Sequence, residues 1–268
     1  MRRALPAGIG LHLFVWGFLL AFVAEDLMAA DNRVLIRVAA AADLQFALEE
    51  LVRSFVQKNR AISVQVTFGS SGNFFSQISN GALFDLFLSA DINYPERLEQ
   101  RGLILPKSKF LYAVGRLALW IPAASPLDVE KLGEKVLLDS QVERIALANS
   151  RHAPYGRAAE EALKSLGIYE TVKHKLVYGE NVAQAFQFVQ SGMAEVGIVA
   201  FSLTRAPHLE GKGKIWEIPV RHFSRMEQGG AILKSSLYLA EARRFCDFLL
   251  APEGREILKK FGFVLPGE

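Results

Sequence analysis

Two neighbouring serines stand in a stretch whose residue types suit ligand binding. The segment FGSSGNFFSQI, residues 68–78, follows an alternating β-type run and places Ser70 and Ser71 between two glycines. The glycines allow a tight turn and a close approach to the backbone, and serine is a preferred N-cap for the helix we predict near Asn73. Hydroxyls and unpaired N–H groups at a helix start donate hydrogen bonds. The segment therefore suits a small group that accepts them.

Three other loops share this arrangement, each at the predicted start of a helix. They are Ala42-Asp43, the APYG loop at residues 153–156, and Glu180-Asn181-Val182. Free N–H groups and the helix dipole favour an anion at such ends. Four of them facing one cleft would hold an anion without a lysine or arginine, whereas each one singly also fits ordinary helix capping. Both interpretations stay open on spacing alone.

The elements that must position these loops alternate between strand and helix. The predicted strands are residues 34–40, 62–68, 84–89, 116–121, 144–148, 176–178, 195–200, 215–220 and 231–233. The predicted helices are one N-capped by Asp43, then residues 73–79, 129–138, 157–166, 182–190, 240–250 and 252–261. This α/β alternation predicts mostly parallel sheets flanked by helices, with ligands at the carboxyl ends of the strands.

Composition bounds the class of protein. The chain has 268 residues, enough for one large or two modest domains, and a formal net charge of +3 without a run of like charge, so no nucleic-acid partner is indicated. Its single cysteine, Cys246, lies in a helical pattern with apolar neighbours, which favours a buried core residue over a free reactive thiol.

The first thirty residues differ in kind from the rest. Arg2 and Arg3 precede an apolar run at residues 8–24, and Met28-Ala29-Ala30 then leads into polar sequence. This layout predicts a signal peptide at residues 1–30 and export to the periplasm. An uncleaved membrane anchor is the alternative, because the apolar run is about the minimum length for a span.

An enzyme is the main alternative to a binding protein, with Ser71 as the nucleophile of a serine hydrolase. The string GSSGN lacks the full G-x-S-x-G elbow, and His152 is the only histidine suited to act as its base. We find no paired-histidine metal motif, P-loop or dinucleotide fingerprint. We therefore predict no catalytic residue and no cofactor.

Several longer strings carry a family resemblance, in order, from Arg37 to Phe263. They include VAAAADLQFALEELVRSF, VTFGSSGNFFSQISNGALFDLFLSAD, ALANSRHAPYGRAAEEALKSLG, VYGENVAQAF and FLLAPEGREILKKFGF. The chain resembles the periplasmic molybdate-binding proteins of molybdenum ABC importers. The resemblance implies a two-lobe (type II) periplasmic binding-protein fold that holds molybdate or tungstate in its cleft and delivers it to a membrane permease.

The family's ligand positions fall on particular residues of this sequence. The resemblance implies that Asp43, Ser71, Tyr155 and Val182 bind the oxyanion, with Ser71 and Tyr155 as hydroxyl donors from opposite lobes. Ala200 stands where many relatives place a tyrosine, a role that Tyr155 takes over. A carboxylate at Asp43 would repel a dianion, so we expect its side chain to cap the helix. If Asp43 instead faces the ligand, another small oxyanion, a metal or a protonated ligand gains support.

The same resemblance implies how the chain is divided. Lobe 1 is expected at residues 31–114 with 222–268, and lobe 2 at 115–221. The predicted crossings are residues 114–116 and 220–228, with Gln228-Gly229-Gly230 as hinge backbone. We expect a monomer.

Overall fold

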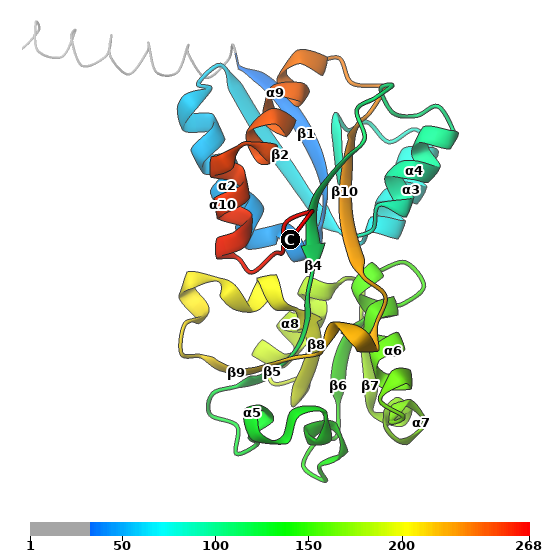
Figure 1. The fold of residues 1–268 in the computed structure, drawn as a ribbon, viewed down its shortest axis with the longest axis vertical. Coiled ribbons are helices and arrows are strands. Elements are labelled where there is room, and N and C mark those ends of the chain that lie inside the picture. The colour runs from blue at the N-terminus through cyan, green and yellow to red at the C-terminus, as the bar shows by residue number, and fades with distance from the viewer. Residues whose placement is uncertain (1–32) are drawn as a thin grey trace, which may run out of the picture.

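The computed structural model describes residues 33–268, which form two α/β lobes stacked along the long axis of the molecule (Figure 1). The predicted signal peptide, residues 1–30, lies outside the described residues. Within residues 33–268, no helix is both long enough and apolar enough to span a membrane.

Lobe 1 is built on a five-stranded sheet with the order β2-β1-β3-β10-β4. Strands β1 to β3 run parallel, and β10 pairs antiparallel with both β3 and β4. The strands are β1 Val34–Ala41, β2 Ile62–Gly69, β3 Leu86–Ser89, β4 Phe110–Gly115 and β10 Met226–Ile232. The helices are α2 Gln45–Lys58, α3 Ser71–Ser79, α4 Asn93–Gln100, α9 Leu239–Leu250 and α10 Pro252–Lys260.

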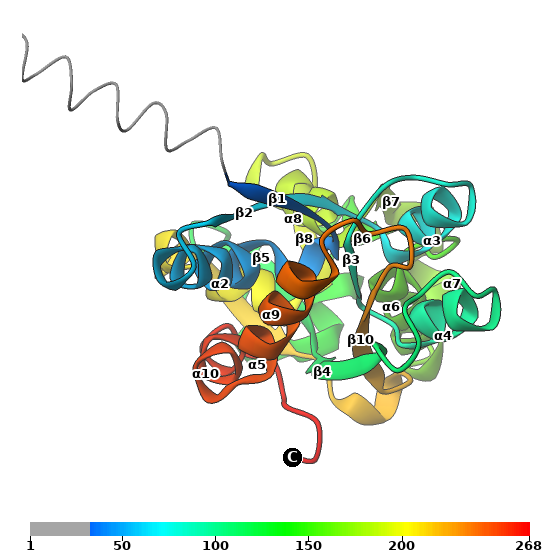
Figure 2. The same ribbon diagram turned by 90° about the horizontal axis from the view of Figure 1, so that it is seen from above.

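The helices of lobe 1 cover both faces of its sheet. Seen from above, α2, α9 and α10 lie on one side and α3 and α4 on the other (Figure 2). Leu48, Leu51 and Phe55 recur on the buried side of α2 and pack with Phe245 of α9. Cys246 on α9 is buried, and burial raises the pKa of its thiol to about 12. The cysteine is therefore a core residue, as predicted.

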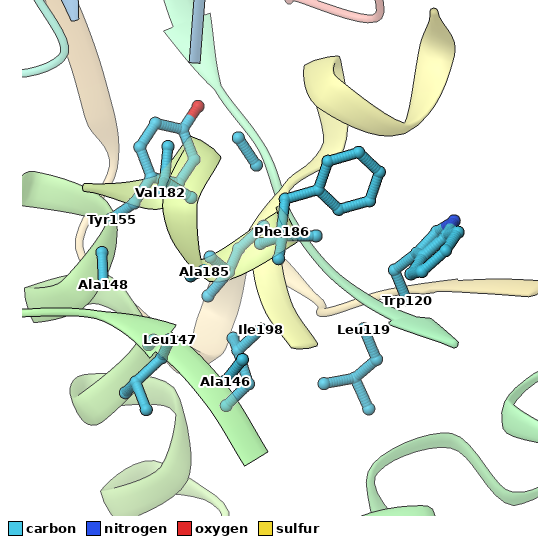
Figure 3. Packing of buried hydrophobic residues seen from close by; sticks show 14 of the residues in the cluster. Leu119, Trp120, Ala146, Leu147, Ala148, Tyr155, Val182, Ala185, Phe186 and Ile198 are labelled. Atoms are coloured by element: carbon cyan, nitrogen blue, oxygen red, sulfur yellow. The ribbon is translucent and has the colours of Figure 1, made fainter. Parts of the chain in front are cut away.

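Lobe 2 repeats the sheet pattern with the order β7-β6-β8-β5-β9. Its strands are β5 Leu117–Pro122, β6 Ile145–Ala148, β7 Leu176–Gly179, β8 Val196–Ala200 and β9 Gly213–Glu217. Its helices are α5 Val129–Leu132, α6 Pro154–Ser165, α7 Tyr169–Val172 and α8 Val182–Gln190. In its core Trp120 of β5 packs edge-on against Phe186 of α8, with ring centroids 4.9 Å apart (Figure 3).

The chain passes between the sheets twice, from β4 to β5 across Arg116 and from β9 to β10. The second passage differs from the predicted hinge backbone. Gln228, Gly229 and Gly230 lie inside β10, paired with β4, so they belong to the sheet. A Cβ on Gly229 would meet Ile92 at 2.0 Å, so this glycine serves close packing rather than backbone freedom.

One predicted helix was wrong in extent. Residues 129–138 form the short helix α5 and then a 3₁₀ segment, Gly133–Leu138. Gly133 adopts φ 57°, a left-handed conformation that ends the α-helix after one turn.

Candidate functional site: a closed pocket between the lobes

A small pocket lies where the two lobes meet. Asp43, Ser70 and Ser71 line it from lobe 1, and Tyr155 and Val182 line it from lobe 2. Its volume is only about 10 Å³, close to the smallest cavity that holds a water molecule. The structure thus brings together all four sequence-predicted site residues, in a closed arrangement of the lobes.

Ser71 occupies the first position of α3, directly after its N-cap Ser70. Its side chain is fully buried, and its Oγ accepts a hydrogen bond of 3.0 Å from the backbone N–H of Ala90. Because the oxygen already accepts, the hydroxyl proton remains available to donate. Of the first N–H groups of α3, those of Gly72 and Asn73 donate to the His152 carbonyl and to Ser70 Oγ, so the N–H of Ser71 is the one that adds a donor to the site.

Asp43 does not cap a helix, so that prediction was wrong. It lies within a 3₁₀ turn, Ala42–Leu44, and the residue in the N-cap position of α2 is Leu44, without a side-chain capping bond. A capping residue must stand just outside the helical turns, whereas Asp43 is already inside one. Its side chain is 1% exposed and lines the pocket instead.

The Asp43 carboxyl group belongs to a buried polar network. Its Oδ2 accepts a hydrogen bond of 2.6 Å from Nε2 of Gln228 on β10. Burial raises the pKa of Asp43 to about 6, and the hydrogen bonds from Gln228 and Tyr155 only partly offset that effect. Asp43 is therefore a carboxyl group that titrates close to neutral pH.

Gln228 links both lobes within this network. Its Oε1 accepts from the hydroxyl of Tyr112 on β4 at 3.0 Å, which leaves Nε2 to donate to Asp43 and, at 3.2 Å, to the hydroxyl oxygen of Tyr155. Burial, followed by the charge of Asp43, raises the pKa of both tyrosines well above its usual value. Both phenols therefore stay protonated and can donate.

Tyr155 reaches the site from the start of α6. Pro154 occupies the first position of α6, where proline is favoured because an N–H there would have no partner within the helix. Tyr155 therefore lies in the first turn. Figure 3 shows its ring beside Val182, with the hydroxyl pointing away from the packed core. Since the Tyr155 oxygen accepts from Gln228, its proton can donate, either to the Asp43 carboxylate or to a ligand.

Val182 contributes a backbone position rather than a reactive side chain. It begins α8, and the N-cap Asn181 accepts bonds from the N–H groups of Ala183 and Gln184 at 3.0 and 3.1 Å. The N–H of Val182, at the first helical position, has no intrahelical acceptor. Ala200, at the end of β8, is buried and does not line the pocket.

Two glycines let the parts of the site approach one another. The N–H of Gly72 donates to the carbonyl of His152 in lobe 2 at 2.9 Å, and an added Cβ would lie 2.6 Å from that oxygen. A Cβ on Gly115, at the first passage between lobes, would lie 2.5 Å from the Tyr155 hydroxyl. The segment around Ser70 and Ser71 therefore needs Gly72 because lobe 2 packs closely against it.

The serine hydrolase alternative finds no support in this geometry. His152 places its Nδ1 2.9 Å from Oγ of Ser70, not of Ser71, and the Ser71 oxygen faces the Ala90 N–H. Ser71 therefore has no histidine base in the part of the chain that the structure describes.

Arginines flank the pocket without lining it. Arg157 of α6 binds Asp91 of lobe 1 at 2.7 Å and the hydroxyl of Tyr94 at 3.1 Å. The pair borders a separate, larger cavity of about 390 Å³, whose charged residues include Glu161 and Arg225. No lysine, arginine or histidine is among the residues that line the small pocket, within residues 33–268.

Sequence reasoning missed two residues of the site, Gln228 and Tyr112. Both are buried polar side chains in strands, and neither stands beside a helix start. The pattern QGG at residues 228–230 was the only signal, and it indicated a hinge.

Comparison with known proteins places the chain in a family. Residues 36–264 match the family model of bacterial extracellular solute-binding proteins. The molybdate-binding protein ModA of Rhodobacter capsulatus is 37% identical over 262 residues, which are 98% of this chain and 97% of that protein. ModA of Azotobacter vinelandii is also 37% identical, over 89% of this chain and 93% of its own.

Solved structures agree with this placement. The periplasmic molybdate-binding protein of Azotobacter vinelandii superposes with a TM-score of 0.80 and 34% identity, covering 86% of this chain and 99% of that one. The sulfate-binding protein SubI of Mycobacterium tuberculosis has a TM-score of 0.70 at 13% identity, with 88% of each chain covered, so it shares the fold alone. The predicted two-lobe periplasmic binding-protein fold is confirmed, and the chain belongs to the family of bacterial extracellular solute-binding proteins, beside its ModA members.

Proposed function

We propose that this protein captures molybdate or tungstate in the pocket between its lobes and delivers the ion to the membrane permease of an ABC importer. Its relatives named molybdate-binding proteins support the ligand class. The proposal includes export by residues 1–30, action as a monomer in the periplasm, and no resident cofactor. Its role is binding and transport rather than catalysis.

The observation that carries the proposal is the set of donors around one small space. Ser71 and Tyr155 each have an oxygen that accepts from an N–H and a proton left to donate. The starts of α3, α6 and α8 add N–H groups and the positive ends of three helix dipoles. Such a site suits a compact dianion, because it supplies hydrogen-bond donors in fixed directions and needs no lysine or arginine side chain.

Ligand entry requires the lobes to separate. The closed pocket is enclosed on the lobe 1 side by Ser71 and on the lobe 2 side by Tyr155 and Val182. We propose lobe 1 at residues 31–114 with 222–268 and lobe 2 at residues 115–221, moving as two bodies about the two passages between the sheets. The bond from Gly72 to His152 would form on closure.

A second candidate ligand is a metal ion, which the carboxyl group of Asp43 favours. Asp43 is the one acidic side chain that lines the pocket, and residues 33–268 hold no group of three or more histidine, cysteine or acidic side chains suited to a metal. A cation would also face the donor protons of Ser71 and Tyr155. The oxyanion is therefore the better match.

Calorimetric titration of the purified protein tests the proposal, with molybdate, tungstate, sulfate, phosphate and zinc chloride added in separate runs. We expect tight binding of molybdate and tungstate, much weaker binding of sulfate and phosphate, and none of zinc. Binding of zinc alone would replace the oxyanion with a cation. The absence of heat and of a melting shift with every oxyanion would overturn the transport function.

A further inference from the structure

The two carboxyl oxygens of Asp43 have different surroundings. Oδ2 accepts from Gln228 at 2.6 Å, whereas Oδ1 is buried and has no hydrogen-bond partner among the described residues. A buried ionised oxygen without a donor is unfavourable. A proton on Oδ1 removes the charge and turns the same oxygen into a donor, while Oδ2 keeps its bond to Gln228.

Among residues 33–268, no cationic group compensates Asp43. The elements around it contribute Tyr112 from β4, Tyr155 from α6 and Gln228 from β10. Helix α8 carries no titratable side chain, and the 3₁₀ segment after β8 contributes Ser202, whose hydroxyl donates to the Asp43 carbonyl at 2.7 Å.

Charged residues of two neighbouring elements have contacts of their own. Arg205 of that 3₁₀ segment lies over the Phe201 ring, and Glu50 of α2 pairs with Lys260. His152, across the cleft, faces Ser70 and Glu180, and His208 packs edge-on against the Phe46 ring of α2. Burial is the largest influence on the pKa of Asp43, and no opposite charge is among its causes.

We propose that Asp43 takes part in oxyanion binding as a neutral acid, donating the proton on Oδ1 to a ligand oxygen. This inference rests on the proposed oxyanion-binding function. Where Asp43 is ionised in the empty protein, one proton from solvent joins it for each dianion bound, and no covalent bond to the ligand forms or breaks. The neutral acid becomes the third hydroxyl of the site, beside Ser71 and Tyr155, whose oxygens each accept from a neighbouring N–H, whereas in Asp43 the N–H of Gln228 holds the other carboxyl oxygen, Oδ2.

The proton makes affinity depend on pH in one direction. In the empty protein the pKa of Asp43 is raised to about 6, so above that pH the group must regain a proton before the ligand binds. The association constant then falls by up to about tenfold per pH unit above about pH 6. Below that range it levels off, because Asp43 is already neutral.

The test is titration of the full protein with sodium molybdate between about pH 5 and about pH 8, in pairs of buffers with different ionisation enthalpies. We expect uptake of about one proton per ligand at the upper end and nearly none at the lower end. Asp43→Asn keeps an acceptor for Gln228 and places an N–H donor where the acid proton stood. We expect this variant to bind with no proton uptake at Asp43, with a flat pH profile, and more tightly than the unmodified protein at high pH.

Asp85→Asn is the matched control. Asp85 is also a buried aspartate of lobe 1, but it accepts from the N–H of Arg37 and the hydroxyl of Ser236, away from the pocket. This variant should keep the pH dependence of the unmodified protein.

Two results would overturn the inference while leaving oxyanion binding intact: pH-independent affinity of the unmodified protein, or the same proton uptake in Asp43→Asn. A lack of proton uptake by the unmodified protein at about pH 8 would also overturn it, so the inference can fail even if the variant does not fold. Failure of the function itself looks different, because then no oxyanion binds at any pH.

Discussion

The two lobes have the same sheet pattern but contribute different chemistry to the pocket. Each has three parallel strands followed by an antiparallel pair, β2-β1-β3 with β10 and β4, and β7-β6-β8 with β5 and β9. In lobe 1 the fourth strand, β10, comes from near the end of the chain, whereas in lobe 2 it is β5, the first strand. Each passage therefore leaves one lobe from its fifth strand, β4 or β9, and enters the other lobe at its fourth strand, β5 or β10.

At the pocket, lobe 1 contributes a buried polar network, and lobe 2 contributes one hydroxyl and two helix starts. Asp43, Ser71 and Gln228 are all buried and hydrogen-bonded within lobe 1. Lobe 2 offers the hydroxyl of Tyr155 beside Ala153, Pro154 and Val182. Lobe 1 thus supplies the hydrogen-bonded network around Asp43, and lobe 2 supplies the hydroxyl of Tyr155 and the N–H groups at the starts of α6 and α8.

The largest expected effect concerns the charge that lobe 1 buries. The pKa of Asp43 is raised in the folded state from 3.8 to about 6, so the folded protein binds more protons than the unfolded chain between these values. Its stability therefore falls as pH rises through this window, by about 3 kcal/mol at about 1.4 kcal/mol per unit.

Urea unfolding of the ligand-free protein and of Asp43→Asn at about pH 4 and about pH 8 measures this loss. From about pH 4 to about pH 8, the free energy of unfolding of the variant should rise by up to about 3 kcal/mol relative to that of the unmodified protein. If the two proteins differed in stability by the same amount at both pH values, the ionised Asp43 carboxylate would not destabilise the folded protein.

Removing one hydroxyl from each lobe tests the comparison directly. A hydrogen bond to a charged group contributes roughly 1.5 to 3 kcal/mol, so Ser71→Ala and Tyr155→Phe should each weaken molybdate binding about ten- to a hundredfold. Ser71→Ala should also lower stability, by about 1 to 3 kcal/mol, because it leaves the buried Ala90 N–H without its acceptor. Tyr155→Phe should lower stability less, because Gln228 Nε2 loses one acceptor but keeps its bond to Asp43. Calorimetry and urea unfolding measure the two quantities, and equal stability losses would remove the distinction between the lobes.

The close approach of the lobes can be blocked at a single backbone position. In Gly72→Ala the new Cβ would lie 2.6 Å from the His152 carbonyl, so closure must leave a gap and affinity should fall about tenfold. Small-angle scattering with saturating molybdate should show a less compact complex than the unmodified protein gives. Ser76→Ala, an exposed position on the same helix, is the control and should close normally.

The smallest effect is expected at the ion pair outside the pocket. Arg157 and Asp91 join the lobes at 2.7 Å with side chains 36% and 21% exposed, and pairs of this kind contribute about 0.2 to 1 kcal/mol. Arg157→Gln should therefore weaken binding only a few-fold, and less so at high salt. A loss as large as that of Ser71→Ala would mean that the guanidinium group contacts the ligand.

Local patterns in the sequence determined much of the fold and located three of the residues that line the pocket. Strand and helix periodicity located α3 and α8 closely, because those signals depend on neighbours within a few residues. Ser71, Tyr155 and Val182 could be identified as helix-start residues for the same reason, with the family resemblance indicating their role. The signal peptide and the division into lobes stay predictions.

Only the tertiary structure decided what surrounds those residues. Asp43 and Gln228 are 185 positions apart, and Tyr155 and Gln228 are 73 apart, so no local pattern could show that they bond. The sequence suggested a helix cap for Asp43 because aspartate commonly caps, and a hinge for Gln228 because two glycines follow it. Folding instead buried both side chains where β10 meets the start of α2, and burial is what moves the pKa of Asp43 toward neutral pH. The charge state of the site is therefore a property of packing, which residue types alone do not determine.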